Sequence, residues 1–281
     1  MLKKRLITAA VLIPLTLAAL FWLNPYAWGS VTLAVVAVAA SEWANLGGYS
    51  KRGSVLFVAA MIGAGGALLF APGSGFRAET GWPDAVPLFV CGAATIFWLL
   101  VAPAWLAFGW HVESKLALAL TGLLVLLAAW LALVQIQARS PALLLALMAV
   151  VWIADTAAYF AGRAFGKRKL APAISPGKTW EGVYGALAAT GVYGLALVYL
   201  VPAIGAPRVG SITAVLGWVV LLLALTSVSI VGDLFESLLK RQRGVKDSGR
   251  ALPGHGGVLD RVDALLAAMP AAALVVQYAL R

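Results

Sequence analysis

The residues best suited to chemistry gather near the end of the chain, in the segment VGDLFESLLKRQRGVKDSGRALPGHGGVLDRVD, residues 231–263. It holds five of the eleven acidic residues: Asp233, Glu236, Asp247, Asp260 and Asp263. Carboxylates that converge from two helices would suit Mg²⁺, which binds through one or two carboxylates together with substrate phosphates. Nearby lysines and arginines would neutralise further phosphate charge. With no obvious nucleophile, the pattern favours phosphoryl or nucleotidyl transfer, in which positioning and electrostatics do most of the catalysis.

Helical spacing groups several of these side chains. Asp233, Ser237 and Lys240 are spaced i, i+4, i+7 and share one face of a helix. Asp260 and Asp263 share the first turn of the last apolar span. The connection between the two helices adds Lys246, Asp247, Gly254, His255, Gly256 and Gly257. Its glycines allow the backbone to approach a ligand closely.

Each of these residues also has a structural interpretation. Asp260 could cap the last helix, and Asp263 could complement the dipole of the same helix. Asp233 could simply end its span, and the basic residues could anchor the chain or attract anionic lipid headgroups. The gathering of so many polar residues in one short connection nevertheless favours a functional site.

A second polar position interrupts the segment WIADTAAYFAGRAFGKRK. Asp155 lies in an apolar span, about one turn from the expected end of that span, on a stripe with Tyr159, Gly162 and Gly166. An ionisable residue inside a span is energetically unfavourable and by default faces a cavity or a partner. Asp155 is therefore a candidate binding residue. The alternative is hydration at the interface or pairing with Arg163.

The segment SPGKTWEG contains the Gly-Lys-Thr of a phosphate-binding loop. The glycine that such a loop requires upstream is replaced by Pro172, which excludes a P-loop. Ser175, Lys178 and Thr179 instead precede a predicted helix, whose N-terminal amides suit an anion such as phosphate. The alternative is an ordinary polar helix cap with Glu181 in the first turn.

These segments must be positioned by transmembrane helices. The chain is 62% hydrophobic and 11% charged, whereas soluble domains carry about 25% charged residues. The apolar residues form long runs, most of them close to the ~20 residues that span a bilayer. We therefore expect an all-α fold, a polytopic transmembrane helix bundle of about nine spans. The expected spans are 6–23, 27–46, 55–71, 87–107, 116–134, 141–160, 180–201, 212–230 and 262–280.

The formal charge of +10 could suggest nucleic acid, but its distribution follows membrane topology. Seventeen of the 21 lysines and arginines fall at the N-terminus or in the second, fourth, sixth and eighth connections. Positive charge marks the cytoplasmic side. We therefore expect a bacterial-type cytoplasmic membrane protein with a cytosolic N-terminus, cytosolic loops at 161–180 and 240–260, and no nucleic-acid partner.

The chemistry is expected in the C-terminal half. We expect N-terminal transmembrane helices in residues 1–140 and a catalytic part in residues 141–281. The only cysteine, Cys91, excludes an internal disulfide framework and a multi-cysteine metal site. We interpret Cys91 as a small apolar packing residue.

Residues 237–263 resemble the signature of the phosphatidate cytidylyltransferases, also called CDP-diacylglycerol synthases. That signature reads Ser-x-apolar-Lys-Arg, four residues, Lys-Asp, then His-Gly-Gly-apolar-x-Asp-Arg-apolar-Asp, and the segment follows it without departure. Residues 152–182, with the Ser-Pro-x-Lys-Thr-Trp-Glu-Gly element, are also similar to the family. The N-terminal half matches only as a set of apolar spans.

The resemblance implies the reaction CTP + phosphatidate → CDP-diacylglycerol + pyrophosphate, at the cytosolic face and with Mg²⁺. It implies that Asp233 and Asp260 bind the metal, with a second cation left open. The candidate catalytic residues are Asp233, Lys246, Asp247, Asp260 and Arg261. The candidate substrate-binding residues are Asp155, Ser175, Lys178, Thr179, Ser237, Lys240, Arg241, His255, Gly256 and Gly257.

The expected partners are CTP, phosphatidate in the bilayer and membrane lipids. Small residues in the spans could also support a homodimer. Phosphatidate is already ionised at neutral pH, so its phosphate needs no general base to attack the α-phosphorus of CTP. Two alternatives remain: a CTP-dependent lipid kinase acting on a polyprenol or phytol, and a lipid or ion transporter with Asp155 as a relay. The absence of a clear internal repeat disfavours a transporter.

Overall fold

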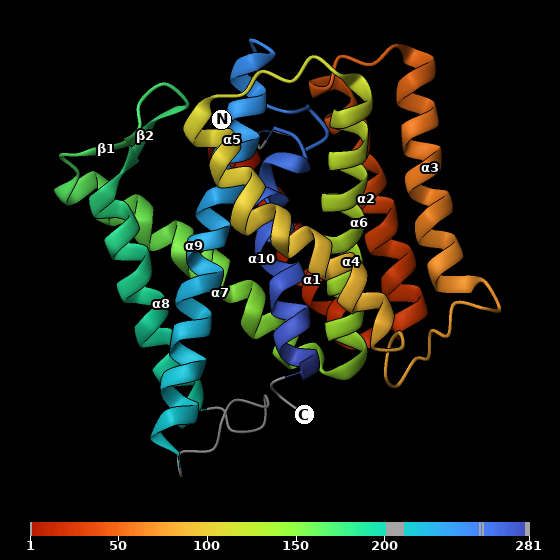
Figure 1. The fold of residues 1–281 in the computed structure, drawn as a ribbon. Coiled ribbons are helices and arrows are strands. Elements are labelled where there is room, and N and C mark those ends of the chain that lie inside the picture. The colour runs from red at the N-terminus through yellow and green to blue at the C-terminus, as the bar shows by residue number, and fades with distance from the viewer. Residues whose placement is uncertain (1, 201–210, 253, 255, 279–281) are drawn as a thin grey trace.

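The long apolar runs form helices throughout the computed structural model, which describes residues 2–200, 211–252, 254 and 256–278 (Figure 1). The helices of this part of the chain are α1 Leu2–Trp22, α2 Pro25–Leu46, α3 Lys51–Phe70, α4 Ala85–Ile96, α5 Ala102–Phe108, α6 Lys115–Arg139, α7 Pro141–Phe165, α8 Trp180–Leu200, α9 Ile212–Gln242 and α10 Leu259–Tyr278. A π-helical turn, Phe97–Val101, joins α4 to α5, just before Pro103, whose missing amide interrupts the α-helical hydrogen bonds.

Seven helical segments are long and apolar enough to cross a membrane, among the residues described. They are Pro25–Leu46, Lys51–Phe70, Ala85–Phe108, Lys115–Arg139, Pro141–Phe165, Trp180–Tyr199 and Ile212–Gln242. The two remaining predicted spans correspond to α1, whose apolar stretch Ala10–Trp22 is shorter, and to α10. The predicted all-α, multi-pass membrane bundle is therefore confirmed.

Three helices, α6, α7 and α9, end at least five residues beyond the predicted spans. The sequence prediction ended the eighth span at residue 230, but α9 continues to Gln242. Phe235, Leu238 and Leu239 are buried in this extension, so packing stabilises the helix beyond its most apolar part. Likewise α7 continues to Phe165, which leaves Asp155 more than one turn before the end of the helix.

Polar caps define where several helices begin. A side-chain oxygen accepts a hydrogen bond from an amide in the first turn, which satisfies a donor that the helix itself leaves unpaired. This role belongs to Asn24 for α2, Ser50 for α3, Ser114 for α6, Ser140 for α7 and Ser211 for α9. The short polar connections thus set the boundaries between spans.

The C-terminal helix α10 lies in the interior of the bundle, packed against α9, α6 and α4 (Figure 1). Helices α7, α8 and α9 form a neighbouring layer in which α8 contacts both α7 and α9. The connections α2–α3, α5–α6, α7–α8 and α9–α10 all lie at one end of the bundle (Figure 1). These are the connections that the charge pattern assigned to one side of the membrane.

An aromatic cluster fixes α9 against the N-terminal helices. Phe235 packs edge-on against Trp105, Trp98 and Phe97, with ring centroids 5.2, 5.5 and 5.5 Å away, and is stacked with Trp43 of α2 at 6.5 Å. Such contacts add to the burial of large apolar area. They hold the polar residues that flank Phe235 in a defined position.

A β-hairpin that the sequence analysis did not predict fills the connection between α7 and α8. Strands β1, Lys169–Ala171, and β2, Ser175–Thr179, pair antiparallel with Ala171 opposite Ser175. The carbonyl of Ala171 accepts the amide of Ile174 at 3.1 Å, closing a turn with Pro172 at its second position, where proline is favoured. The hairpin carries Ser175 and Lys178 back toward the bundle.

Candidate functional site

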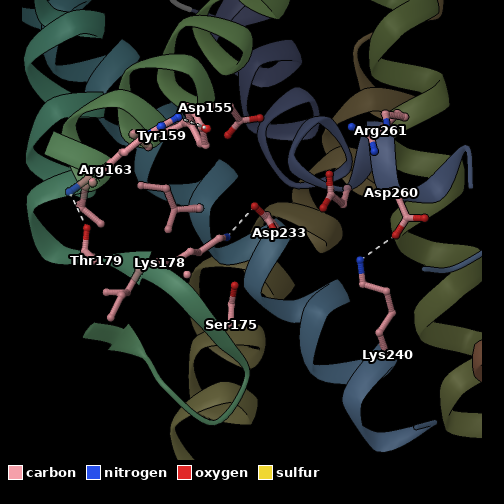
Figure 2. Close-up of a pocket in the computed structure, with 18 of the residues that line it drawn as sticks. Asp155, Tyr159, Arg163, Ser175, Lys178, Thr179, Asp233, Lys240, Asp260 and Arg261 are labelled. Carbon is pink, nitrogen blue, oxygen red and sulfur yellow. Dashed lines mark hydrogen bonds and ion pairs between the residues drawn. The ribbon is translucent and has the colours of Figure 1, made fainter. Parts of the chain in front are cut away.

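A polar cavity of about 630 Å³ is bordered by α7, the hairpin, α8, α9 and the start of α10 (Figure 2). Of the predicted site residues, those that line it are Asp155, Ser175, Lys178, Thr179, Asp233, Lys240, Asp247, Asp260 and Arg261. They come from three separate segments of the sequence. The fold therefore brings together the three polar segments that the sequence analysis singled out.

An ion pair joins the hairpin to α9. Lys178 Nζ lies 2.6 Å from Asp233 Oδ2, and Figure 2 shows the two side chains pointing toward one another. Ser237 donates its hydroxyl to the other oxygen of Asp233 at 3.4 Å, so the predicted helical spacing places them in contact. Arg241 lies outside the cavity, where its Nε donates to the carbonyl of Ile174 at 3.1 Å. Arg241 therefore holds the tip of the hairpin.

Asp260 lies at the centre of a second, more buried cluster. Its Oδ1 is 2.7 Å from Lys240 Nζ, and its Oδ2 accepts the amides of Gly257 at 2.8 Å and Ser248 at 3.0 Å. Lys240 also lies 2.5 Å from Glu236 Oε2. The side chains of Glu236, Asp260 and Lys240 are 4%, 8% and 11% exposed. The i, i+4 spacing of Glu236 and Lys240 is the sequence signal that could have placed Glu236 at the site.

A close approach of α9 and α10 adds Asp263 to the cavity. A Cβ at Gly232 would lie 2.7 Å from both the Ala267 Cβ and the Asp263 carbonyl oxygen. Glycine is therefore required where the two backbones meet. Asp263 lines the cavity, and its Oδ1 accepts the amide of Ala264 at 2.8 Å. The sequence analysis named Asp263 among the acidic residues of this segment and on the same turn as Asp260, but assigned it no catalytic, binding or metal role.

The start of α8 combines a helix cap with one wall of the cavity. Thr179 Oγ1 accepts the amide of Gly182 at 3.2 Å, as a helix-capping residue does. Glu181 accepts the amides of Lys167 at 3.0 Å and Arg168 at 3.2 Å. Thr179 therefore caps α8 and also borders the cavity, as do Ser175 and Lys178 in the strand before the helix. Glu181 instead binds the connection between α7 and β1.

Asp155 borders the cavity from α7, together with Tyr159. Arg163 Nη1 donates to the hydroxyl of Tyr159 at 3.2 Å. Among the ion pairs of the described residues, none joins Asp155 to Arg163. Asp155 is thus an exposed residue at the border of the cavity, a position that suits both a binding role and simple hydration.

Several predicted residues of the α9–α10 connection lie beside the cavity. Lys246 is exposed and does not border it, although its neighbour Asp247 does. Gly256 accepts the amide of Leu252 at 2.9 Å through its carbonyl, and Gly257 donates to Asp260. His255 lies outside the described residues.

Five aspartates border the cavity: Asp155, Asp233, Asp247, Asp260 and Asp263. Within the described residues, no group of three or more acidic, histidine or cysteine side chains forms a preassembled metal cage. A carboxylate has about four lone pairs that can accept hydrogen bonds or bind a metal. Asp233 is contacted by two donor groups and Asp260 by three, so each carboxylate keeps a lone pair for a metal ion. The arrangement fits an ion such as Mg²⁺, which needs one or two carboxylates and completes its shell with substrate phosphates and water.

The chain is similar to known proteins over nearly its whole length. Residues 3–279 match the sequence model of the Cytidylyltransferase family. A protein of Pseudomonas aeruginosa named phosphatidate cytidylyltransferase is 43% identical over 279 residues, covering 96% of this chain and 95% of the relative. Another so named, from Haemophilus influenzae, is 36% identical over 283 residues, covering 96% of each chain. A third, from Brucella suis, is 56% identical over 124 residues, 43% of this chain and 42% of the relative.

Proposed function

Because the chain belongs to the cytidylyltransferase family, we propose that it converts CTP and phosphatidate into CDP-diacylglycerol and pyrophosphate. The observation that carries the proposal is a single cavity, at one end of a membrane bundle, that is bordered by five aspartates and four basic residues. Cations suit the phosphates of both substrates, and carboxylates suit the metal that a nucleoside triphosphate brings with it.

The basic residues of the cavity would bind the phosphate groups. They are Arg163, Lys178, Lys240 and Arg261. Lys178 can exchange Asp233 for a phosphate with little movement, because its ammonium group already borders the cavity. The apolar side chains of Leu170, Val183 and Ile230 also border the cavity. They would favour entry of a lipid headgroup from the bilayer, where its acyl chains remain.

The reaction needs alignment more than acid–base chemistry. An ionised oxygen of the phosphatidate phosphate attacks the α-phosphorus of CTP, and a new P–O bond forms. The bond from the α-phosphorus to the bridging oxygen breaks in line, and its electron pair leaves with pyrophosphate. Lysine and arginine side chains stabilise the charge on the leaving pyrophosphate. Fixed positions for both phosphates lower the barrier by removing the entropic cost of bringing them together.

Mg²⁺ is the proposed cofactor, held by Asp233 and Asp260. Asp260 belongs to the signature segment 237–263, and the family resemblance implies the same role for Asp233, which lies just before that segment. When bound, it would neutralise phosphate charge and help to orient the triphosphate. Asp233, with fewer hydrogen-bond donors around it, has the greater capacity to accept such an ion. A second cation could share the five-aspartate cavity.

The proposed arrangement in the cell follows the charge distribution. The cavity end would face the cytosol of a bacterial-type cytoplasmic membrane, with the N-terminus on the same side. Membrane lipids would surround the bundle, and two copies could associate as a homodimer. Every residue that borders the cavity belongs to residues 141–281, which supports the proposed catalytic part, with residues 1–140 as the transmembrane part beside it.

The direct test uses purified protein in detergent with phosphatidate, Mg²⁺ and CTP labelled on the α-phosphate. We expect label in a lipid-extractable product and no product when a chelator is added. Labelled lipid that forms only from γ-labelled CTP and a lipid alcohol would instead indicate a lipid kinase. A folded protein that yields no labelled lipid from either substrate pair would contradict the proposal and favour a transporter.

A further inference from the structure

A buried glutamate of the N-terminal half reaches the signature segment. Glu42 of α2 is 4% exposed, and its carboxylate accepts the amide of Leu259 at 2.7 Å and the amide of Val258 at 3.1 Å. The same carboxylate accepts the hydroxyl of Ser248 at 3.2 Å. An ionisable side chain inside a span normally has a function or a partner; the partners of Glu42 lie more than 200 residues away in sequence.

These contacts cap α10 from another helix. Val258 precedes the first residue of α10 and has no side-chain oxygen to accept the unpaired amides of the first turn. Glu42 supplies that acceptor, and its negative charge complements the positive end of the helix dipole. Five other helices of the bundle use their own asparagine or serine for this purpose. The cap of α10 thus depends on the position of α2.

Glu42 and Asp260 both accept hydrogen bonds from the connection between α9 and α10 and from the start of α10. Ser248 donates its amide to Asp260 and its hydroxyl to Glu42. Gly257 donates its amide to Asp260, and the two amides that follow donate to Glu42. Any displacement of this backbone away from Glu42 would therefore also withdraw the two amides that orient the Asp260 carboxylate.

Two glycines make room for the Glu42 carboxylate. A Cβ at Gly249 would clash with Glu42 Oε1, and a Cβ at Gly257 would lie 2.6 Å from Glu42 Oε2. Such separations are too short for real side chains, so the connection approaches Glu42 as closely as its backbone permits. These two glycines of the signature segment therefore serve the contact with α2.

We infer that Glu42 is a positioning residue: it holds the α9–α10 connection and the first turn of α10, and thereby sets the direction of the Asp260 carboxylate. Its effect on catalysis rests on the function proposed above. Its effect on the connection does not, because that is a property of the folded chain alone.

The test is hydrogen–deuterium exchange of the full chain in detergent, comparing the wild type with Glu42→Gln. Glutamine keeps the size of the side chain but replaces one acceptor oxygen with an amino group. An amino group cannot accept a hydrogen bond from Ser248, Val258 or Leu259. We expect peptides that cover residues 246–252 and 256–262 to exchange about tenfold faster, the effect of losing one hydrogen bond. Peptides that cover the hairpin should not change. If Glu42→Gln exchanged at the wild-type rate in both 246–252 and 256–262, the inference would be overturned.

Kinetics distinguish positioning from a general loss of structure. We expect Glu42→Gln to lower kcat/KM for CTP roughly 10- to 100-fold, as changes to residues that orient metal ligands do. It should also raise the Mg²⁺ concentration that gives half-maximal activity. Thr32→Val is the matched control, because Thr32 is a buried polar residue of the same helix whose hydroxyl donates to the carbonyls of Trp28 and Gly29 within α2. It should leave exchange and activity unchanged.

A double-mutant cycle with Ser248→Ala completes the test. If Glu42 acts through Ser248, the kcat/KM of the double variant should lie within about twofold of that of Glu42→Gln alone. If the fold-losses of the two single variants multiply in the double variant, the two residues act independently, and this part of the inference is wrong. If Glu42→Gln does not fold, Ser248→Ala alone decides, through faster exchange in the same peptides. A wild type without cytidylyltransferase activity would refute the proposed function, and the exchange result would still decide whether Glu42 holds the connection.

Discussion

Both ends of α10 are surrounded by polar side chains, but the chemistry of the two ends differs. At the start of the helix, carboxylates and ammonium groups gather around a cavity. At the other end, Gln277 donates to Asp84 at 2.6 Å and accepts from Gln135 at 3.3 Å. Gln135 in turn accepts the amide of Trp82 at 2.8 Å. This second network consists mainly of amides and backbone groups.

The difference separates a site that carries function from one that maintains the fold. Amide groups in the Gln135–Gln277 network meet complementary donors and acceptors, and both side chains are almost completely buried. Such a network stabilises the packing of α10 against α6 at little electrostatic cost. Around Asp260, the carboxylates of Glu236 and Asp260 are held close together by one ammonium group, that of Lys240, in a partly desolvated place. Such an arrangement is more typical of a functional site than of a stabilising contact.

The strongest test of this comparison is Asp260→Asn. The change removes a negative charge that Lys240 and two backbone amides contact. We expect kcat/KM to fall roughly 1000-fold, the upper range for removing one group that stabilises charge in an active site. The measurement is the formation of α-labelled lipid from labelled CTP. Full Mg²⁺-dependent activity in the variant would remove Asp260 from the site.

A smaller effect is expected from Lys178→Ala, which removes the cation that the hairpin brings to Asp233. Loss of one phosphate-binding cation should lower kcat/KM for CTP roughly 10- to 100-fold, mainly through KM. Lys169→Ala is the matched control, because Lys169 has the same charge, lies in the same hairpin, and is exposed away from the cavity. Equal losses in the two variants would show that only the overall charge of the hairpin matters.

The sequence predicts the helices well because the physics of a bilayer leaves few alternatives. An apolar run of about 20 residues must pair its backbone groups internally, and a helix does so. The hairpin could not be predicted in the same way, because a strand of three residues such as Lys169–Ala171 shows no periodicity. Its register depends on where α7 and α8 place its two ends.

The site could be predicted from sequence where its residues lie close together in one segment. Asp260 and Lys240 belong to one polar segment, and the fold pairs them. Lys246 and Asp247 are neighbours in sequence, yet only Asp247 borders the cavity, because a connection rich in glycine has no period that fixes which side chain faces inward. Glu42 gave one usable signal, an acidic residue in an apolar span. Its partners follow only from the packing of α2 against α10.

An effect on activity smaller than that of Lys178→Ala is expected from Gly249→Ala. Gly249 lies where the connection before α10 packs against Glu42 of α2. The added methyl group would clash with the Glu42 carboxylate, so we expect kcat/KM to fall about tenfold, similar to the loss of one hydrogen bond. In a Glu42→Ala background the same change should have little further effect, because the clash is gone. Gly63→Ala in α3, where an added Cβ meets no atom within 4 Å, should leave activity unchanged.

The smallest effect on activity, together with a clear effect on stability, is expected from Gln277→Leu at the other end of α10. The change leaves Asp84 and Gln135 without the amide that contacts both of them. Loss of one buried and one partly buried hydrogen bond should lower the free energy of unfolding by about 1–3 kcal/mol. A lower Tm in detergent, with kcat/KM of the folded protein within about twofold of the wild type, would fit a purely structural network.

Tyr278→Phe is the matched control for Gln277→Leu, because the hydroxyl of Tyr278 contacts the carbonyl of Asp84 at 3.3 Å from an exposed position. Removal of this contact should lower Tm less, since water can replace an exposed hydrogen bond. If Gln277→Leu instead lowered kcat/KM as much as Lys178→Ala does, the two ends of α10 would be coupled through the helix. The division between a functional end and a structural end would then be wrong.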